Sequence, residues 1–173
     1  MGDKNKINEN KMKGIKIDSV ILHCSTGDQA LLEKCMLLLE RIGDAKPIET
    51  IAKKRIPEWK IRPGIPVGCK VTIRGKKAEE LLKRFFEGVN EFKKEQFNEG
   101  FFSFGIKEYF SIPSIPYQRD LGILGFDVIV KLKRAGYRVM LRKRCKSKIP
   151  KRHRISKEET IEFFKNKFNL KIK

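Results

Sequence analysis

The chain has 173 residues, of which 40 are Lys or Arg and 21 are Asp or Glu, so its formal net charge at pH 7 is +19. Because so much like charge opposes compaction, we expect a polyanionic partner: nucleic acid, an anionic membrane surface or an acidic protein. No apolar run approaches the roughly 20 residues of a membrane span, and the first residues lack the apolar segment of a signal peptide, which indicates a soluble intracellular protein.

The N-terminal end differs from the rest of the chain. Residues 1–13 are polar and rich in Lys and Asn, which predicts a flexible, disordered arm. Residues 14–173 contain no internal repeat and no low-complexity linker, so we expect a single domain. It begins with a predicted strand, because Ile, Val and Leu alternate with polar residues from Ile15 to Cys24.

Two helices are predicted from apolar residues spaced three and four apart. The first follows the turn at Gly27-Asp28 and should end at Gly43. The second should begin after Gly75. Their buried stripes are expected at Leu31, Cys35, Leu38 and Ile42 in the first and at Ala78, Leu81, Phe85, Val89 and Phe92 in the second.

Between these helices the sequence predicts two strands and a loop. Pro47 opens a short β-prone stretch through Ala52. The prolines and bases of residues 53–66 exclude a regular element and predict an ordered or semi-ordered basic loop. Val67–Arg74 alternates apolar with polar residues, the clearest strand pattern in the chain.

The second half adds strands and a final helix. Strands are predicted for the FSFGIKEYF segment, residues 102–110, and for residues 125–133, with a turn at Ala135-Gly136 leading into 137–141. Ser156 and Glu159 form a capping box for a helix that buries Ile161, Phe164 and Phe168. This order of elements predicts an α+β fold: an antiparallel sheet with helices packed on one face, basic irregular loops, and the other face free for a partner.

Groups for catalysis or metal binding do not assemble in the sequence. The four cysteines, Cys24, Cys35, Cys69 and Cys145, are scattered, which predicts free thiols and no zinc site. Gly64, Gly68 and Lys70 lack the spacing of a phosphate-binding loop. We therefore expect no enzyme activity, no cofactor and no metal.

The charge is concentrated near the C-terminus. Between Asp127 and Glu158 there are thirteen basic residues and no acidic one. A solvated surface normally mixes signs, so this basic tract 131–157 predicts phosphate contacts, with a merely solubilising loop as the alternative. The candidates for these contacts are Arg134, Arg138, Arg142, Lys143, Arg144, Lys148, Lys151, Arg152, His153 and Arg154.

The strand Val67–Arg74 gives a second candidate surface. Its apolar residues should face the helices, which leaves Lys70, Thr72 and Arg74 on the open side of the sheet, within reach of RNA backbone oxygens and 2′-hydroxyls. The alternative is a plain solvent-facing strand. Trp59 in the basic loop has two readings as well, stacking on a base or packing on its own domain.

Three stretches resemble one known family, the universal large-subunit ribosomal protein numbered L five in bacteria and L eleven in eukaryotes. The first, residues 52–75, contains KIRPGIPVGCKVTIRG, close to the family's KIR-x-G-x-P-(I/V)-G-(A/C)-KVT-(L/I)-RG. The second, residues 102–130, matches its FG-(I/V)-x-E and G-(I/L)-x-G-(L/M/F)-D segments. The third, RAGYRV and IPKRHRISKEE within residues 134–159, resembles the archaeal and eukaryotic branch.

The resemblance implies a ribosomal protein of the large subunit that binds 5S rRNA in the central protuberance. Its further implied partners are the large-subunit rRNA, P-site tRNA, a neighbouring 5S-binding protein and a small-subunit head protein, in the cytoplasm or, for a eukaryote, in the nucleolus during assembly. By position, Thr72 matches a family Thr implicated in 5S contact, while Ala45 replaces a usual Gln. The expected 5S-binding residues are His23, Lys46, Lys70, Thr72 and Arg74, and the expected tRNA-facing ones are Lys53, Lys54, Arg55, Trp59, Lys60 and Arg62.

Two other functions remain open at this point. A non-ribosomal RNA-binding assembly factor of the same fold would carry the same charge pattern. An RNA-processing enzyme would need a nucleophile or metal site, which the sequence does not offer.

Overall fold

A computed structural model describes residues 11–89, 91–113 and 115–173. The expected arm at 1–13 therefore lies mostly outside the described residues, and Lys11–Lys13 form a short 3-10 helix. The strands are β1 (Lys16–Ser25), β2 (Ile48–Ile51), β3 (Pro66–Ile73), β4 (Phe97–Asn98), β5 (Phe101–Ile106) and β6 (Phe126–Lys133). The helices are α1 (Gln29–Gly43), α2 (Lys76–Gly88), α3 (Arg138–Leu141) and α4 (Lys157–Phe168).

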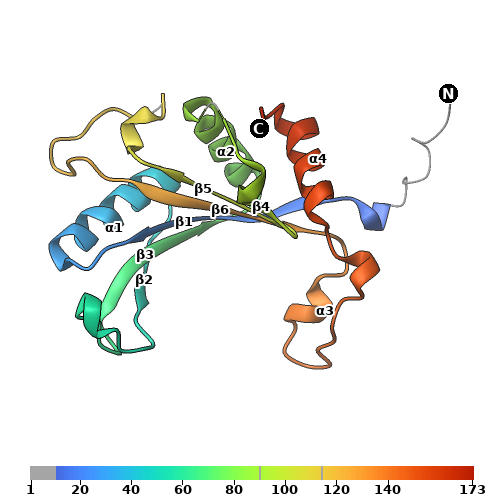
Figure 1. The fold of residues 1–173 in the computed structure, drawn as a ribbon, viewed down its shortest axis with the longest axis horizontal. Helices are drawn as coiled ribbons and strands as arrows, with labels where there is room; N and C mark the ends of the chain where they lie inside the picture. The colour runs from blue at the N-terminus through green and yellow to red at the C-terminus, as the bar shows by residue number, and fades with distance from the viewer. Residues whose placement is uncertain (1–10, 90, 114) are drawn as a thin grey trace.

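The strands form one antiparallel sheet in the order β2-β3-β1-β6-β5-β4. Helix α1 packs on β1 and β3, α2 on β1, and α4 on β4. Figure 1 shows these three helices on one side of the sheet, while the β2–β3 connection and the α3 segment extend from the other side. This confirms the expected α+β fold with helices on one face of an antiparallel sheet.

Alternation along the central strands decides which side chains meet the helices. In β1, Val20, Leu22 and Cys24 are buried, and the residues between them are less so. In β3 the buried side chains are those of Cys69, Val71 and Ile73, as the sequence pattern predicts. Because successive strand residues point to opposite faces, the polar residues between them lie on the helix-free face.

Phenylalanines fill the core beneath α2 and α4. The ring of Phe97 stacks on Phe102 with centroids 4.2 Å apart, and Phe164 of α4 lies 4.8 Å from Phe102. Such ring pairs add roughly 0.5–1.5 kcal/mol each beyond their buried area. They attach α4 to β4 and β5, and so fix where the basic tract that precedes α4 ends.

The first predicted helix ends at Gly43 as expected, and Asp44 follows it with a left-handed φ of 46°. Its buried stripe needs one correction. Leu31 is 38% exposed and its neighbour Leu32 is buried in its place, whereas Cys35, Leu38 and Ile42 are buried as expected. A continuous run of Leu and Met in this helix leaves the periodicity ambiguous.

The second predicted helix is shorter than expected. It ends at Gly88, and Phe92 is buried outside it, in a parallel bridge with Ile172 near the C-terminus. The expected strand over 102–110 also ends early, at Ile106, and Tyr109–Ser111 form a 3-10 helix. Strand β4 has only two residues and was not predicted.

Three of the four cysteines are not scattered in space. Cys24, Cys35 and Cys69 are buried together between α1 and the strands β1 and β3, and Cys24 lies opposite Cys69 in the ladder. All are free thiols, and Cys145 is exposed. Among the described residues, no helix has the length and apolar character that a membrane crossing requires.

Candidate nucleic-acid interface

Helices α1, α2 and α4 leave the opposite face of the sheet uncovered in the part of the chain that the structure describes. We call it the open face and define it by the outward residues of the three central strands. These are Ile21 and His23 of β1, Lys70 and Thr72 of β3, and Asp127, Ile129, Lys131 and Lys133 of β6.

The register arranges these residues in rows across the strands. His23 stands between Lys70 on β3 and Asp127 on β6, and its Nδ1 lies 4.0 Å from Asp127 Oδ2. In the next row, Ile21 separates Thr72 from Ile129. The open face is thus less basic than expected, with an apolar centre and an acidic group beside the histidine.

A hairpin extends one end of this face. Residues 52–65, the basic hairpin, continue the β2–β3 pair through hydrogen bonds from Ala52 to Ile65 at 2.9 Å and between Ile56 and Ile61 at 3.0 and 3.1 Å. Lys60 takes a left-handed φ of 55° at its tip. This segment is more regular than the irregular loop the sequence predicts, because backbone bonds form across it despite the prolines.

The basic hairpin presents its charged residues to solvent. All six tRNA-facing candidates are exposed: Lys53, Lys54, Arg55, Trp59, Lys60 and Arg62. Trp59 is 68% exposed, so in the free protein it does not pack on its own domain, which was one of the two alternatives for this residue. Its indole is available to stack on a partner.

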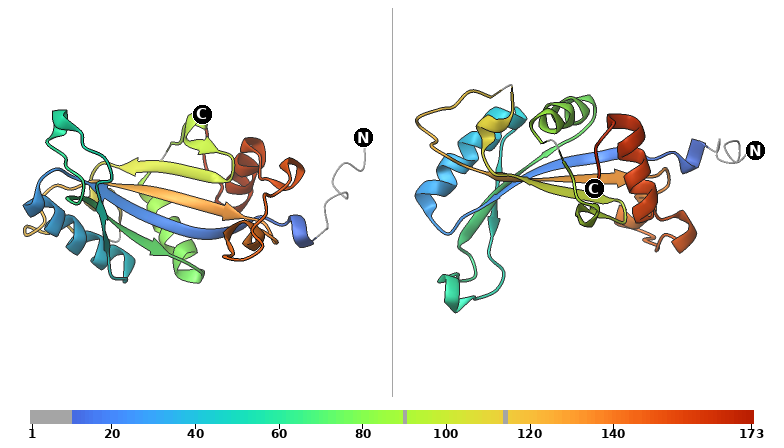
Figure 2. Two further views of the ribbon diagram at one scale, coloured as in Figure 1. Left: turned by 90° about the horizontal axis from the view of Figure 1, so that it is seen from below. Right: turned by 45° about the horizontal axis from the view of Figure 1, so that its top comes forward.

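The basic tract forms a second extension at the opposite end of the sheet. In the left view of Figure 2 the strands run between the basic hairpin at one end and the α3 segment at the other. The expected phosphate contacts that are exposed in this extension are Arg138, Arg142, Lys143, Arg144, Lys148, Lys151, Arg152 and Arg154. Since the two extensions leave the sheet on its helix-free side (Figure 1), basic groups border the open face at both ends.

Two of the expected phosphate contacts have structural roles instead. Arg134 is only 8% exposed, and its guanidinium donates to Lys13 O, His153 O, Arg154 O and the Glu159 carboxylate. His153 is half-buried, with Nε2 2.9 Å from the Ala135 carbonyl oxygen. Both residues close the base of the extension, and four of the five N–H donors of Arg134 are used within the protein.

Lys46 precedes β2, in which Ile48 pairs with Lys70. It is exposed between α1 and β2 and borders a hollow together with Glu33 and Glu40 of α1. Arg74, which follows β3, is exposed near the far end of that strand. The structure therefore groups His23, Lys70 and Thr72 on one surface and leaves Lys46 at the edge.

Residues of β6 on the open face were not selected from the sequence. Lys131 and Lys133 lie beside Asp18 of β1, with Lys133 Nζ 2.8 Å and Lys131 Nζ 3.6 Å from its carboxylate. Burial raises the pKa of Asp18, but the two ammonium groups outweigh it and hold the pKa below its usual value. The alternation of β6 would have identified both lysines, whereas the pairing with Asp18 depends on a bulge in β1.

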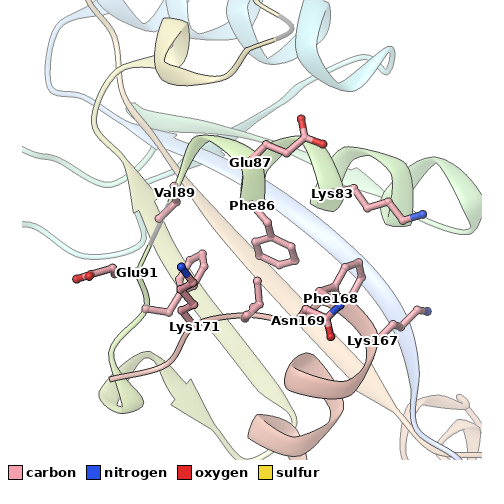
Figure 3. Close-up of a pocket in the computed structure, with 11 residues that line it drawn as sticks. Lys83, Phe86, Glu87, Val89, Glu91, Lys167, Phe168, Asn169 and Lys171 are labelled. Atoms are coloured by element: carbon pink, nitrogen blue, oxygen red, sulfur yellow. The ribbon is translucent and has the colours of Figure 1, made fainter.

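Another hollow lies on the helix side, between α2 and the end of α4 (Figure 3). Its volume is about 530 Å³, and the rings of Phe86 and Phe168 lie side by side in it with centroids 5.1 Å apart. Its rim carries both signs, Lys83 and Lys171 against Glu87 and Glu91. This mixed surface does not continue the basic one. Nor do His, Cys, Asp and Glu gather in threes for a metal ion anywhere in the part of the chain that the structure describes.

Comparison with known proteins gives two family matches. The model described as ribosomal protein L5 matches residues 10–62, and the one described as the C-terminus of the same ribosomal family matches residues 66–163. The large ribosomal subunit protein uL5 of Sulfurisphaera tokodaii is 44% identical over 94% of this chain and 94% of its own. The proteins of the same name from Nanoarchaeum equitans and Archaeoglobus fulgidus are each 40% identical over 95% of this chain, covering 99% and 93% of their own lengths.

Proposed function

Because the chain belongs to the ribosomal protein L5 family, and is thus a structural protein of the large ribosomal subunit, we propose that its open face binds 5S rRNA. The single observation that carries this proposal is the position of the open face between two basic extensions. The extensions supply charge for phosphates, and the face between them supplies the hydroxyl of Thr72 and the amine of Lys70 beside apolar side chains.

The chemistry of the open face fits an RNA duplex or loop read through its backbone. Thr72 offers a hydroxyl that both donates and accepts, which suits a 2′-hydroxyl, and Lys70 beside it suits a phosphate. Ile21 and Ile129 form an apolar centre against which a ribose can pack. We propose Lys70, Thr72 and His23 as the contacts that give preference for 5S rRNA, with Arg74 as an added phosphate contact.

The basic hairpin is proposed to reach toward P-site tRNA. It stands clear of the sheet with Arg55, Lys60 and Arg62 exposed, and Trp59 extends from its tip. Backbone bonds across the hairpin stiffen it, so less order has to be gained on contact. The proposed small-subunit contact and the neighbouring 5S-binding protein rest on family resemblance alone.

The test is a titration of the purified full chain with homologous 5S rRNA and, separately, with a tRNA, both near physiological salt. A preference of about tenfold or more for 5S rRNA supports a specific docking surface. Equal affinity for both RNAs would contradict it, because charge alone binds RNA without preference.

A further inference from the structure

A hollow lies on the helix-free side of the molecule, where β6 ends and the basic tract begins. Its volume is about 370 Å³, and it is separate from the basic hairpin. Its main walls are the side chains of Lys131, Lys133, Tyr137, Arg138, Met140 and Leu141, with Asp18 at its floor.

The walls of this hollow include exposed apolar side chains from the basic tract. Met140 and Leu141 are 37% and 63% exposed, although they sit in an otherwise basic segment. Short helix α3 holds both side chains in place, since Arg142 N donates to Arg138 O and Ser147 N to Val139 O. Exposed apolar groups held in a fixed shape indicate a contact surface for a partner.

The rim carries a net positive charge. Lys131, Lys133 and Arg138 are opposed by Asp18 alone, because Arg134 is already paired with Glu159. Asp18 also holds both lysine ammonium groups at the sheet end of the hollow. The lining of the hollow thus combines the ammonium groups of Lys131 and Lys133, from β6, with the apolar side chains of Met140 and Leu141, from α3.

We propose that this hollow receives one unstacked nucleotide of ribosomal RNA, with its base against Met140 and Leu141 and its phosphate on Lys133 and Arg138. A nucleotide has this distribution, an apolar ring face joined to an anion, and proteins recognise RNA largely through unpaired bases that leave the stack. The volume falls at the lower end of the roughly 300–1,000 Å³ of small-ligand sites. The inference rests on the proposed function for the RNA, and adds a site that meets the open face at Lys131 and Lys133 but does not include His23, Lys70 or Thr72.

The experiment places a photoreactive side chain in the hollow, by the substitution Leu141→p-benzoylphenylalanine in the full chain. A matched control carries the same group in place of Ile123, which is 69% exposed in the segment between β5 and β6. Each protein is cross-linked in complex with 5S rRNA and in reconstituted large subunits. The two arms distinguish a nucleotide of 5S rRNA from one of the larger rRNA.

We expect the group at position 141 to label one or two adjacent unpaired nucleotides, and the control to label none of them. Removing that base to leave an abasic site should weaken binding of the unaltered protein about fivefold or more, and should have little effect on a Leu141→Ser variant. Labelling spread over paired nucleotides, or equal affinity for intact and abasic RNA, would overturn the proposal. If 5S rRNA shows no preference over tRNA but position 141 labels one base of the larger rRNA, the open-face proposal fails and this one stands.

Discussion

Arg134 donates a hydrogen bond to the Glu159 carboxylate across 2.6 Å, joining the residue that starts the basic extension to the cap of the helix that follows it. The same guanidinium donates to the backbone oxygens of His153 and Arg154. Tyr137 adds a second link, because its hydroxyl accepts from Ile155 N. These bonds hold together the two ends of a segment whose exposed positive charges repel one another.

Arg134→Ala should destabilise the fold by about 2–3 kcal/mol, because a buried charged donor with four acceptors is lost. Urea unfolding monitored by circular dichroism measures the change. The matched control is Arg138→Ala, an exposed position where we expect less than about 0.5 kcal/mol. If both variants unfold at the same urea concentration, Arg134 does not stabilise the fold by holding the two ends of the basic tract together.

Acid should loosen the same junction. Burial raises the pKa of Glu159, but the hydrogen bond from the Ser156 N–H and the Arg134 guanidinium outweigh it, and the pKa lies below its usual 4.5. A lowered folded-state pKa means that the stabilisation is complete above about pH 4.5 and is lost as the pH falls through the folded-state value. Glu159→Gln should reduce the drop in unfolding free energy between pH 6 and pH 3, and an unchanged slope would argue against the ion pair.

Thr72→Val should lower the preference for 5S rRNA over tRNA by a larger factor than Lys148→Ala. Valine has nearly the same shape as threonine but cannot hydrogen-bond, so the loss reports the hydroxyl. Lys148 is exposed in the basic extension, so its removal should weaken both RNAs about equally and reduce the salt dependence of binding. Small and equal effects of both substitutions on the preference would refute the open-face assignment.

Trp59→Ala should accelerate dissociation of P-site tRNA from ribosomes that carry the variant by about fivefold, since a stacked aromatic ring is lost. Trp59→Phe retains a ring and is the control, with dissociation close to that of the unaltered protein. The measurement is release of labelled tRNA over time. Equal rates for all three proteins would show that the hairpin makes no stacking contact.

The sequence predicts strands better than helix ends in this chain. β3 alternates between buried and more exposed residues from Cys69 to Ile73, so both of its faces follow from the pattern there. α1 contains Leu31, Leu32, Leu37, Leu38 and Leu39, and such a run fits more than one stripe. The burial of Phe92 depends on a contact with Ile172, eighty residues later, which local periodicity does not contain.

The sequence is sufficient to predict which basic residues of the candidate interface are exposed where no distant part of the chain binds them. Arg55, Lys60 and Arg62 are exposed as expected, because nothing in the hairpin pairs with them locally. Arg134 differs, since its acceptors come from Lys13 and from residues about twenty positions later in the chain. In the sequence, Arg134 cannot be distinguished from the other basic residues around it. Only the fold shows that its guanidinium binds other parts of the protein.

The central claim, that RNA binds the helix-free face, is tested most directly by two charge reversals of equal size. One variant carries Lys70→Glu and Arg74→Glu beside the open face, and the other carries Lys83→Glu and Arg84→Glu on the exposed side of α2. Both lower the net charge equally, and urea unfolding confirms that each is folded. We predict that affinity for 5S rRNA near physiological salt falls about a hundredfold in the first and less than about fivefold in the second. Equal losses in the two variants would contradict the account, because binding would then follow net charge and not the face.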